Sequence, residues 1–117
     1  MFRIINIGVL SQNKIWGETS RMREGISSTC TLLEMGGHRL LVDPSPRRED
    51  LERLLFNRAG LRPEAIDMVY ATHWHGDHLF GLRLFEHATW LMAAEGIAEW
   101  QEKAPDYRHL ADHFVPA

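Results

Sequence analysis

The sequence contains one cysteine, no long hydrophobic run and no strong excess of charge, and each absence excludes a class of protein. Cys30 is the only cysteine among 117 residues, so no disulfide can form within the chain, as is usual in a reducing compartment. No apolar run approaches the roughly 20 residues of a membrane-spanning helix. The net charge of -3 gives no electrostatic reason to expect nucleic-acid binding. We therefore expect a cytoplasmic protein without a membrane or nucleic-acid partner.

The motifs of several common catalytic sites are also missing. The chain has no G-x-S-x-G turn and no glycine-rich phosphate-binding loop. Cys30 lies in a strand-like run without basic neighbours, which favours a buried apolar role over that of a nucleophile. No repeat, low-complexity segment or linker is present, and 44% of the residues are hydrophobic and 25% charged. This composition is typical of one globular domain covering residues 1–117.

The first part of the chain predicts strands. Residues 2–10 are apolar and β-branched, which indicates a buried strand, and residues 11–26 are polar and predict a loop. The runs 28–35 and 38–43 are strand-like and are separated by two glycines, a pair typical of a tight hairpin turn.

The rest of the chain predicts alternating helices and strands. Leucines at helical spacing indicate a helix that starts near Ser45 as N-cap, has Pro46 in its first turn and ends at Gly60. The elements expected next are a strand over 65–71, a helical turn over 82–86, a strand over 87–93, a helix over 94–104 and an amphipathic turn within 106–117. This order predicts an α/β (α+β layered) fold, a mixed sheet covered by helices on one face.

The segment ATHWHGDHLFG follows the strand predicted at 65–71 and is dense in metal-binding side chains. Four of them fall within six positions: His73, His75, Asp77 and His78. Side chains two apart on an extended segment point to the same side, so the first two can face one ion. Gly76 permits a sharp turn, after which the last two can face a second point nearby. The motif predicts a metal site in a loop at the end of a strand.

The donor types narrow the chemistry of this site. Imidazole nitrogen with carboxylate oxygen and no sulfur suits zinc, iron, manganese or nickel better than soft copper. Zinc is the favoured metal, because it is common in hydrolytic sites. It lowers the pKa of bound water to about 7. Asp77 is the candidate catalytic residue, which can orient that water or accept its proton. Trp74, between two predicted ligands, can either line a pocket or pack in the core.

The quoted segment resembles the H-x-H-x-D-H signature of the metallo-β-lactamase superfamily. The stretches STCTLLEMGGHRLLVDPSP and HATWLMAAEGIAEWQ are similar to an early hairpin and to a later strand and helix of that family. The resemblance implies half of a four-layer αβ/βα sandwich with two zinc ions at its edge. His73 and His75 would bind the first ion. Asp77 and His78 would bind the second, and Asp43 would orient the loop. The early loop that contains Trp16 would border the substrate.

Later ligands of a full family member, two histidines and a bridging aspartate, have no counterpart in the sequence. Three explanations stay open. The chain is a piece of a longer hydrolase that stops after the first half of the fold, or it is a half-fold that pairs with itself or another chain through an exposed apolar sheet face. Alternatively, its own residues replace the missing ligands. The candidates are His109 and His113, spaced i, i+4, and less strongly His38 and His87.

These observations predict a metal-dependent hydrolase. Its small-molecule substrate would carry an ester, amide, thioester or phosphoester bond, and its partner would be a second copy or the missing half. Two alternatives stay open: a non-catalytic metal-binding half-domain that needs a partner chain, and an iron-dependent oxidoreductase of the same fold. The substrate itself is not predicted, because the fold hosts many chemistries.

Overall fold

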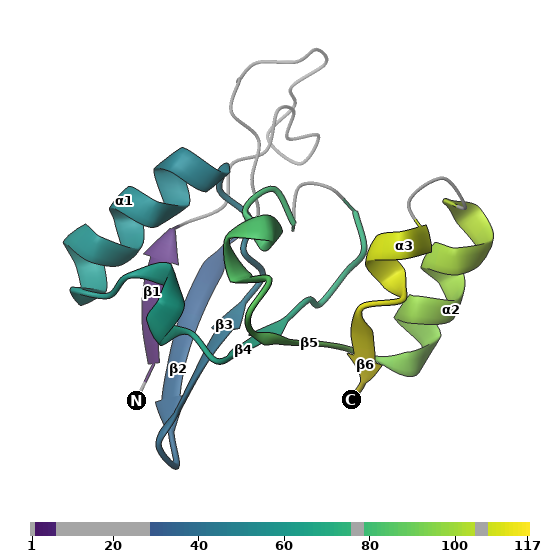
Figure 1. Cartoon of the computed structure of the whole chain (residues 1–117), viewed down its shortest axis with the longest axis horizontal. Helices are drawn as coiled ribbons and strands as arrows, with labels where there is room; N and C mark the ends of the chain where they lie inside the picture. Colours follow the sequence, from purple (N-terminus) through teal and green to yellow (C-terminus); the bar gives the residue numbers. More distant parts are fainter. Residues whose placement is uncertain (1, 7–28, 76–78, 105–107) are drawn as a thin grey trace, which may run out of the picture.

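The structure, a computed structural model, describes residues 2–6, 29–75, 79–104 and 108–117 and is drawn in Figure 1. Six strands form one sheet whose order follows the chain. The strands are β1 (Phe2–Asn6), β2 (Cys30–Met35), β3 (His38–Val42), β4 (Met68–Tyr70), β5 (Thr89–Met92) and β6 (Phe114–Pro116). The helical segments are α1 (Arg48–Ala59), α2 (Ala94–Lys103), α3 (Arg108–Ala111) and the short 3-10 turns η2 (Pro63–Ala65) and η4 (Leu82–Phe85).

The hairpin predicted around the glycine pair joins β2 to β3. Gly36 and Gly37 have φ angles of 59° and 78°, and Met35 pairs with His38 on either side of them. Positive φ at both central positions is the geometry of a type I′ turn, which glycine adopts without steric strain. The tight turn fixes the register of the two strands, so their alternate side chains point to opposite faces of the sheet.

One face of the sheet is covered by helices, as the sequence predicts. Strands β3 to β6 run parallel, so the chain crosses over the sheet between them, and right-handed crossovers in one direction leave their helices on one side. Four neighbours in register are buried: Leu41, Val69, Trp90 and Phe114. They share one core cluster with Leu51 and Leu55 of α1 and Trp100 of α2. The predicted α/β architecture is confirmed.

The opposite face, which we call the open face, is apolar and is not covered by the described residues. Its members alternate with the buried side chains along each strand. Its apolar members are Phe2, Ile4, Leu33, Met35, Leu40, Val42, Met68, Tyr70, Leu91 and Val115, and Thr31, His38 and Thr89 lie on the same face. The exposed fraction reaches 67% for Phe2 and 44% for Ile4. The prediction of a buried first strand is therefore wrong for these two residues, whereas Ile5 is buried.

Helix α1 ends where the sequence predicts but begins later. Gly60 ends it in a left-handed conformation, with φ 67°. The predicted N-cap, Ser45, is buried outside the helix, and the residue at the actual cap position, Arg47, forms no capping bond with its side chain. The Ser45 N–H donates to the carbonyl of Asp43 at 2.6 Å. The residue thus belongs to a tight turn before the helix, and Pro46 also precedes the first helical residue.

The later strands are shorter than predicted, and one is an addition. The strand predicted over 65–71 is shorter, because its first residue belongs to η2 and β4 covers three residues. Strand β5 covers the middle of the predicted run 87–93. The predicted helical turn and helix are present as η4 and α2. Strand β6 pairs with β5 where the sequence predicts only an amphipathic turn, since three residues ending in proline give no clear periodicity. No helix in the described ranges is long and apolar enough to cross a membrane.

Candidate metal centre

The metal loop, defined as residues 72–81, begins just after the carboxyl end of β4. This strand belongs to the parallel part of the sheet, and ligand sites of α/β sheets lie at the carboxyl ends of parallel strands. His73 and His75 lie in the described part of the loop. Gly76, Asp77 and His78 lie outside the described residues, so the predicted role of the last two stays a prediction.

The two described histidines of the metal loop lie side by side. The ring centroids of His73 and His75 are 3.9 Å apart, with the rings at 63° to each other. The backbone N–H of His75 donates to Nδ1 of His73 at 3.3 Å. The two side chains therefore lie on the same side of the loop, as spacing two apart predicts; that they bind one ion stays a prediction. Within the described ranges, no three histidine, cysteine, aspartate or glutamate side chains form a group able to hold a metal, so this pair needs further ligands.

Asp43 fastens the start of the metal loop to the end of β3. Its carboxylate accepts hydrogen bonds from the Thr72 N–H at 2.8 Å and from the Thr72 hydroxyl at 2.6 Å. Its own N–H donates to the Tyr70 carbonyl at 2.9 Å. Asp43 is buried and has a φ of 55°, a left-handed conformation that costs a non-glycine residue about 1 kcal/mol or more. These bonds hold Thr72, the residue before His73, against the end of β3. The orienting role that the family resemblance implies for Asp43 stays a prediction.

A second attachment, which sequence reasoning missed, holds the far end of the metal loop. The Gly81 N–H donates to the Pro44 carbonyl at 2.8 Å. A Cβ at position 81 would lie 2.5 Å from Leu51 Cδ2 and 2.7 Å from the Pro46 carbonyl oxygen, so this close approach requires glycine. Both ends of the metal loop are therefore attached to the turn of residues 43–46. The signal in the sequence was a single glycine, which does not reveal its partner.

Trp74 packs behind the two histidines. Its ring centroid is 4.6 Å from that of His75 and 6.1 Å from that of His73. The indole contacts the core cluster and also lines a pocket, so both roles considered from the sequence apply. Its Nε1 is buried and has no hydrogen-bond partner among the described atoms. Trp74 thus limits the positions that the histidine rings can take.

Glu99 of α2 lies beside the metal loop, and nothing in the sequence indicates this. The pKa of its carboxyl group is lowered mainly by Lys103, with which it forms an ion pair at 3.2 Å. The nearby Trp74 N–H and the charge of His73 lower this pKa further, by smaller amounts. Because Trp74 Nε1 completes no hydrogen bond, we take Glu99 as a neighbouring negative charge and not as a firm partner of the indole.

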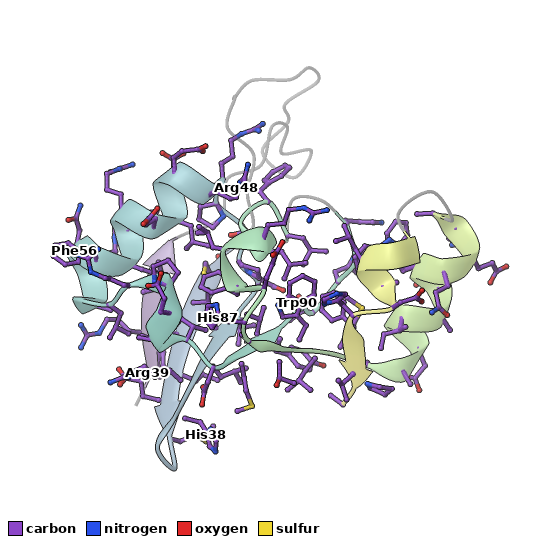
Figure 2. All side chains as sticks on the ribbon, in the orientation of Figure 1. His38, Arg39, Arg48, Phe56, His87 and Trp90 are labelled. Carbon is purple, nitrogen blue, oxygen red and sulfur yellow. The ribbon has the colours of Figure 1, made fainter. Side chains whose placement is uncertain are left out.

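Two weaker histidine candidates have other partners. The His38 Nδ1–H donates to an oxygen of Asp67 at 2.7 Å, and both side chains are about half exposed. His38 lies at the far end of the hairpin (Figure 2). The ring of His87 hydrogen-bonds through Nε2 to the Ile66 carbonyl at 2.9 Å. These bonds give both residues structural roles.

The remaining candidates also give no ligand group. His113 lies against Trp90, with ring centroids 5.0 Å apart, and the side chain of His109 lies outside the described part, so their pairing is untested. Cys30 is buried, and this burial raises the pKa of its thiol to about 12, which agrees with the predicted apolar role. Trp16 lies outside the described residues.

Comparison with known proteins assigns a family. The family model described as the metallo-beta-lactamase superfamily matches residues 23–116. A search of curated protein sequences gave no match. Among solved structures, a Thermotoga maritima protein assigned to the metallo-β-lactamases superposes with a TM-score of 0.65 at 22% identity, over 99% of this chain and 57% of its own.

Two further structures extend the likeness. AidC, a dizinc quorum-quenching lactonase, superposes with a TM-score of 0.61 at 14% identity, over 74% of this chain and 42% of its own. The chemotaxis sensor ODP, solved with a peroxy diiron species, has a TM-score of 0.58 at 16% identity, over 98% of this chain and 39% of its own. At these identities the likeness establishes the fold alone. The chain spans between about two fifths and three fifths of the length of these three proteins.

Proposed function

The chain belongs to the metallo-β-lactamase superfamily, and from this premise we propose that it supplies the first part of a metal-dependent hydrolase site. The observation that carries the proposal is the pair His73 and His75, with rings 3.9 Å apart at the end of a parallel strand. Hydrolytic relatives of the same fold, such as the dizinc lactonase, support it.

The donors of the metal loop fit a zinc site. Imidazole nitrogens without sulfur suit zinc, and also iron or manganese. In the proposed site His73 and His75 hold one ion and Asp77 and His78 a second. Zinc, when bound, supplies hydroxide at neutral pH by lowering the pKa of its water to about 7. The substrate we propose is a small molecule with an ester, amide, thioester or phosphoester bond.

The chain's own residues have separate tasks in this proposal. Asp43 orients the loop through Thr72, since its two hydrogen bonds fix the backbone one residue before His73. Trp74 packs behind the rings and limits the positions that they can take. Asp77 accepts the proton of the attacking water on its carboxylate. A catalytic zinc normally takes three protein ligands plus water, so further donors must join the pair.

We propose that a second layer covers the open face and brings these donors. The large hydrophobic side chains exposed on that face are Phe2, Ile4, Met35 and Val115, and an exposed apolar area of this kind marks an interface. A second copy of the chain or a further polypeptide segment can provide the layer. The proposed location is the cytoplasm, because a single buried cysteine fits a reducing compartment.

Two other functions have a specific observation in their favour. A non-catalytic metal-binding half-domain that needs a partner chain is favoured by the large apolar side chains exposed on the open face. An iron-dependent oxidoreductase is favoured by the likeness to a sensor that holds a diiron species. Metal identity after anaerobic purification separates zinc from iron.

Metal content tests the leading proposal. The purified chain should bind zinc near stoichiometrically by elemental analysis, and a His73→Ala, His75→Ala double variant should lose most of it. His38→Ala is the matched control, because its ring bonds to Asp67 far from the loop. Metal content that is low in the wild type and unchanged in the double variant would contradict the proposal.

Solution mass and turnover separate the hydrolase from the half-domain. A dimer that hydrolyses generic ester or phosphodiester substrates supports a composite active site. A monomer that binds zinc tightly and shows no turnover supports the non-catalytic half-domain. Sedimentation analysis of the same sample used for the activity assay provides both readings.

A further inference from the structure

An apolar pocket lies between the metal loop and α2. Its volume is about 440 Å³, which lies within the usual range for small-molecule sites. The lining includes Trp74, Leu79 and Phe80 of the metal loop, Trp100 of α2 and Leu110 of α3. These side chains are aromatic or aliphatic, so the pocket suits an uncharged hydrocarbon or aryl group.

A basic depression adjoins this pocket. It has a volume of about 330 Å³ and shares Phe80 and Arg83 with the apolar pocket. Arg47 and Arg48 line it too, with Glu49 as its acidic member. Figure 2 shows Arg48 at the end of α1 nearest η4. The lining has three guanidinium groups and one carboxylate, and Arg83 also pairs with Glu86 at 3.5 Å. The depression therefore keeps a local excess of one positive charge, although the chain as a whole carries -3.

Phe80 lies at the boundary between the two regions. The Arg47 guanidinium carbon lies 5.0 Å from the centre of its ring, a cation–π distance, and its side chain is 39% exposed. A ligand that crosses this boundary would place an apolar body against Trp74 and Trp100. Its head would then lie near the guanidinium of Arg83.

We propose that the two adjoining regions form one binding site for an amphipathic anion, with the apolar body in the pocket and an oxyanion head among the arginines. Carboxylate and phosphate are the heads that guanidinium groups recognise best. The inference goes beyond the hydrolase proposal, because binding requires neither a metal ion nor turnover. The ligand contacts Trp74, which lies between two predicted metal ligands, so it adjoins the metal loop.

Calorimetric titration of the metal-free chain tests the site. Decanoate should bind saturably with one site per chain. Decanol, which has the same body and no charge, should bind about tenfold more weakly, and acetate, which has only the head, should not bind measurably. Decyl phosphate compared with decanoate shows which oxyanion is preferred. Equal binding of decanoate and decanol would overturn the role of the arginines, and absence of decanoate binding would overturn the site.

Two substitutions separate the head from the body. Arg83→Gln should weaken decanoate binding about tenfold and leave decanol binding unchanged. Its matched control is Arg53→Gln, because Arg53 pairs with Asp50 as Arg83 pairs with Glu86, at i,i+3 spacing with both side chains exposed. Ala104→Phe places a ring in the pocket and should weaken both ligands. Unchanged binding in either Arg83→Gln or Ala104→Phe, with circular dichroism as in the wild type, would contradict the proposal.

Discussion

The two faces of the sheet contain similar apolar residues but differ in whether a layer covers them. Leu40 and Leu41 are consecutive in β3, yet Leu41 is fully buried under the helices while Leu40 lies half-buried on the open face. Strand geometry alone sends them to opposite sides. The comparison teaches that the alternation of a strand predicts an apolar face on both sides of the sheet but does not show what covers each side; for the open face, a second layer is our proposal.

The largest expected effect distinguishes the two leucines. Leu41→Ala should lower the free energy of unfolding by about 2–5 kcal/mol, because it leaves a cavity in the packed core. Leu40→Ala should lower it by about 1 kcal/mol, since less of its surface leaves water on folding. Urea unfolding of both variants measures the difference. Equal losses would mean that the open face is as well packed as the covered one.

The reactivity of a thiol on each face, one native and one introduced, sharpens the comparison of the two faces. Cys30 points to the covered side, and its raised pKa, about 12, should make it nearly inert to a thiol reagent at pH 8. Thr31 lies on the open face next to it. In a Thr31→Cys variant the new thiol should react at least about tenfold faster than Cys30. If a second copy covers the open face, the rate should fall as the protein concentration rises.

A charge on the open face should change association more than stability. Val115→Lys should alter the free energy of unfolding by no more than about 0.5 kcal/mol, because the side chain is 48% exposed. The same change should weaken any self-association of the chain by sedimentation analysis. Phe114→Lys is the contrasting variant. It places a charge at the neighbouring buried position and should unfold the chain. An association constant that Val115→Lys leaves unchanged would exclude this face as the contact.

The smallest expected effect concerns pH at the edge of the sheet. His38 and the Arg39 N–H both donate to Asp67, and these bonds lower the pKa of its carboxyl group. The folded state therefore favours the ionised form, so this stabilisation is present above the pKa of an unfolded aspartate and is lost as pH falls through the folded value. In an Asp67→Asn variant the melting temperature should fall slightly less steeply as pH is lowered through that acidic range. The effect is small because the carboxyl group is exposed. The substitution should therefore lower thermal stability slightly at neutral pH, where Asp67 is ionised, and the difference from the wild type should disappear as pH falls. A difference that grows towards acidic pH would contradict this.

Most of the covered face could be predicted from the sequence. Its hairpin, the C-terminal end of α1 and the layer order follow from the glycine pair, from Gly60 and from the alternation of apolar residues, which are local signals. The N-cap prediction at Ser45 was wrong because Asp43 adopts a left-handed backbone conformation, and the Ser45 N–H then bonds to the Asp43 carbonyl in a tight turn before the helix. Strand β6 was missed because its pairing depends on β5, a partner distant in sequence.

The candidate site also contains features that local spacing predicts and features that it does not. The spacing of His73 and His75 predicts that their side chains lie on one side of the loop, and their rings are in contact. Asp43 bonds to Thr72, and its role at a metal site stays a prediction. The neighbourhood of Glu99 and the attachment at Gly81 depend on contacts between distant segments, which spacing within one motif does not encode. Asp77 and His78 lie outside the described residues, and their roles as metal ligands stay predictions.

The attachment of both ends of the metal loop to residues 43–46 has a thermodynamic consequence. Bringing the ends of a flexible segment together costs entropy that rises with the logarithm of its length. The bonds at Thr72 and Gly81 offset that cost when the chain folds, so in the proposed site the binding of an ion would not include it. The ion affinity of the proposed site would therefore depend on the turn of residues 43–46, which supplies none of the proposed ligands.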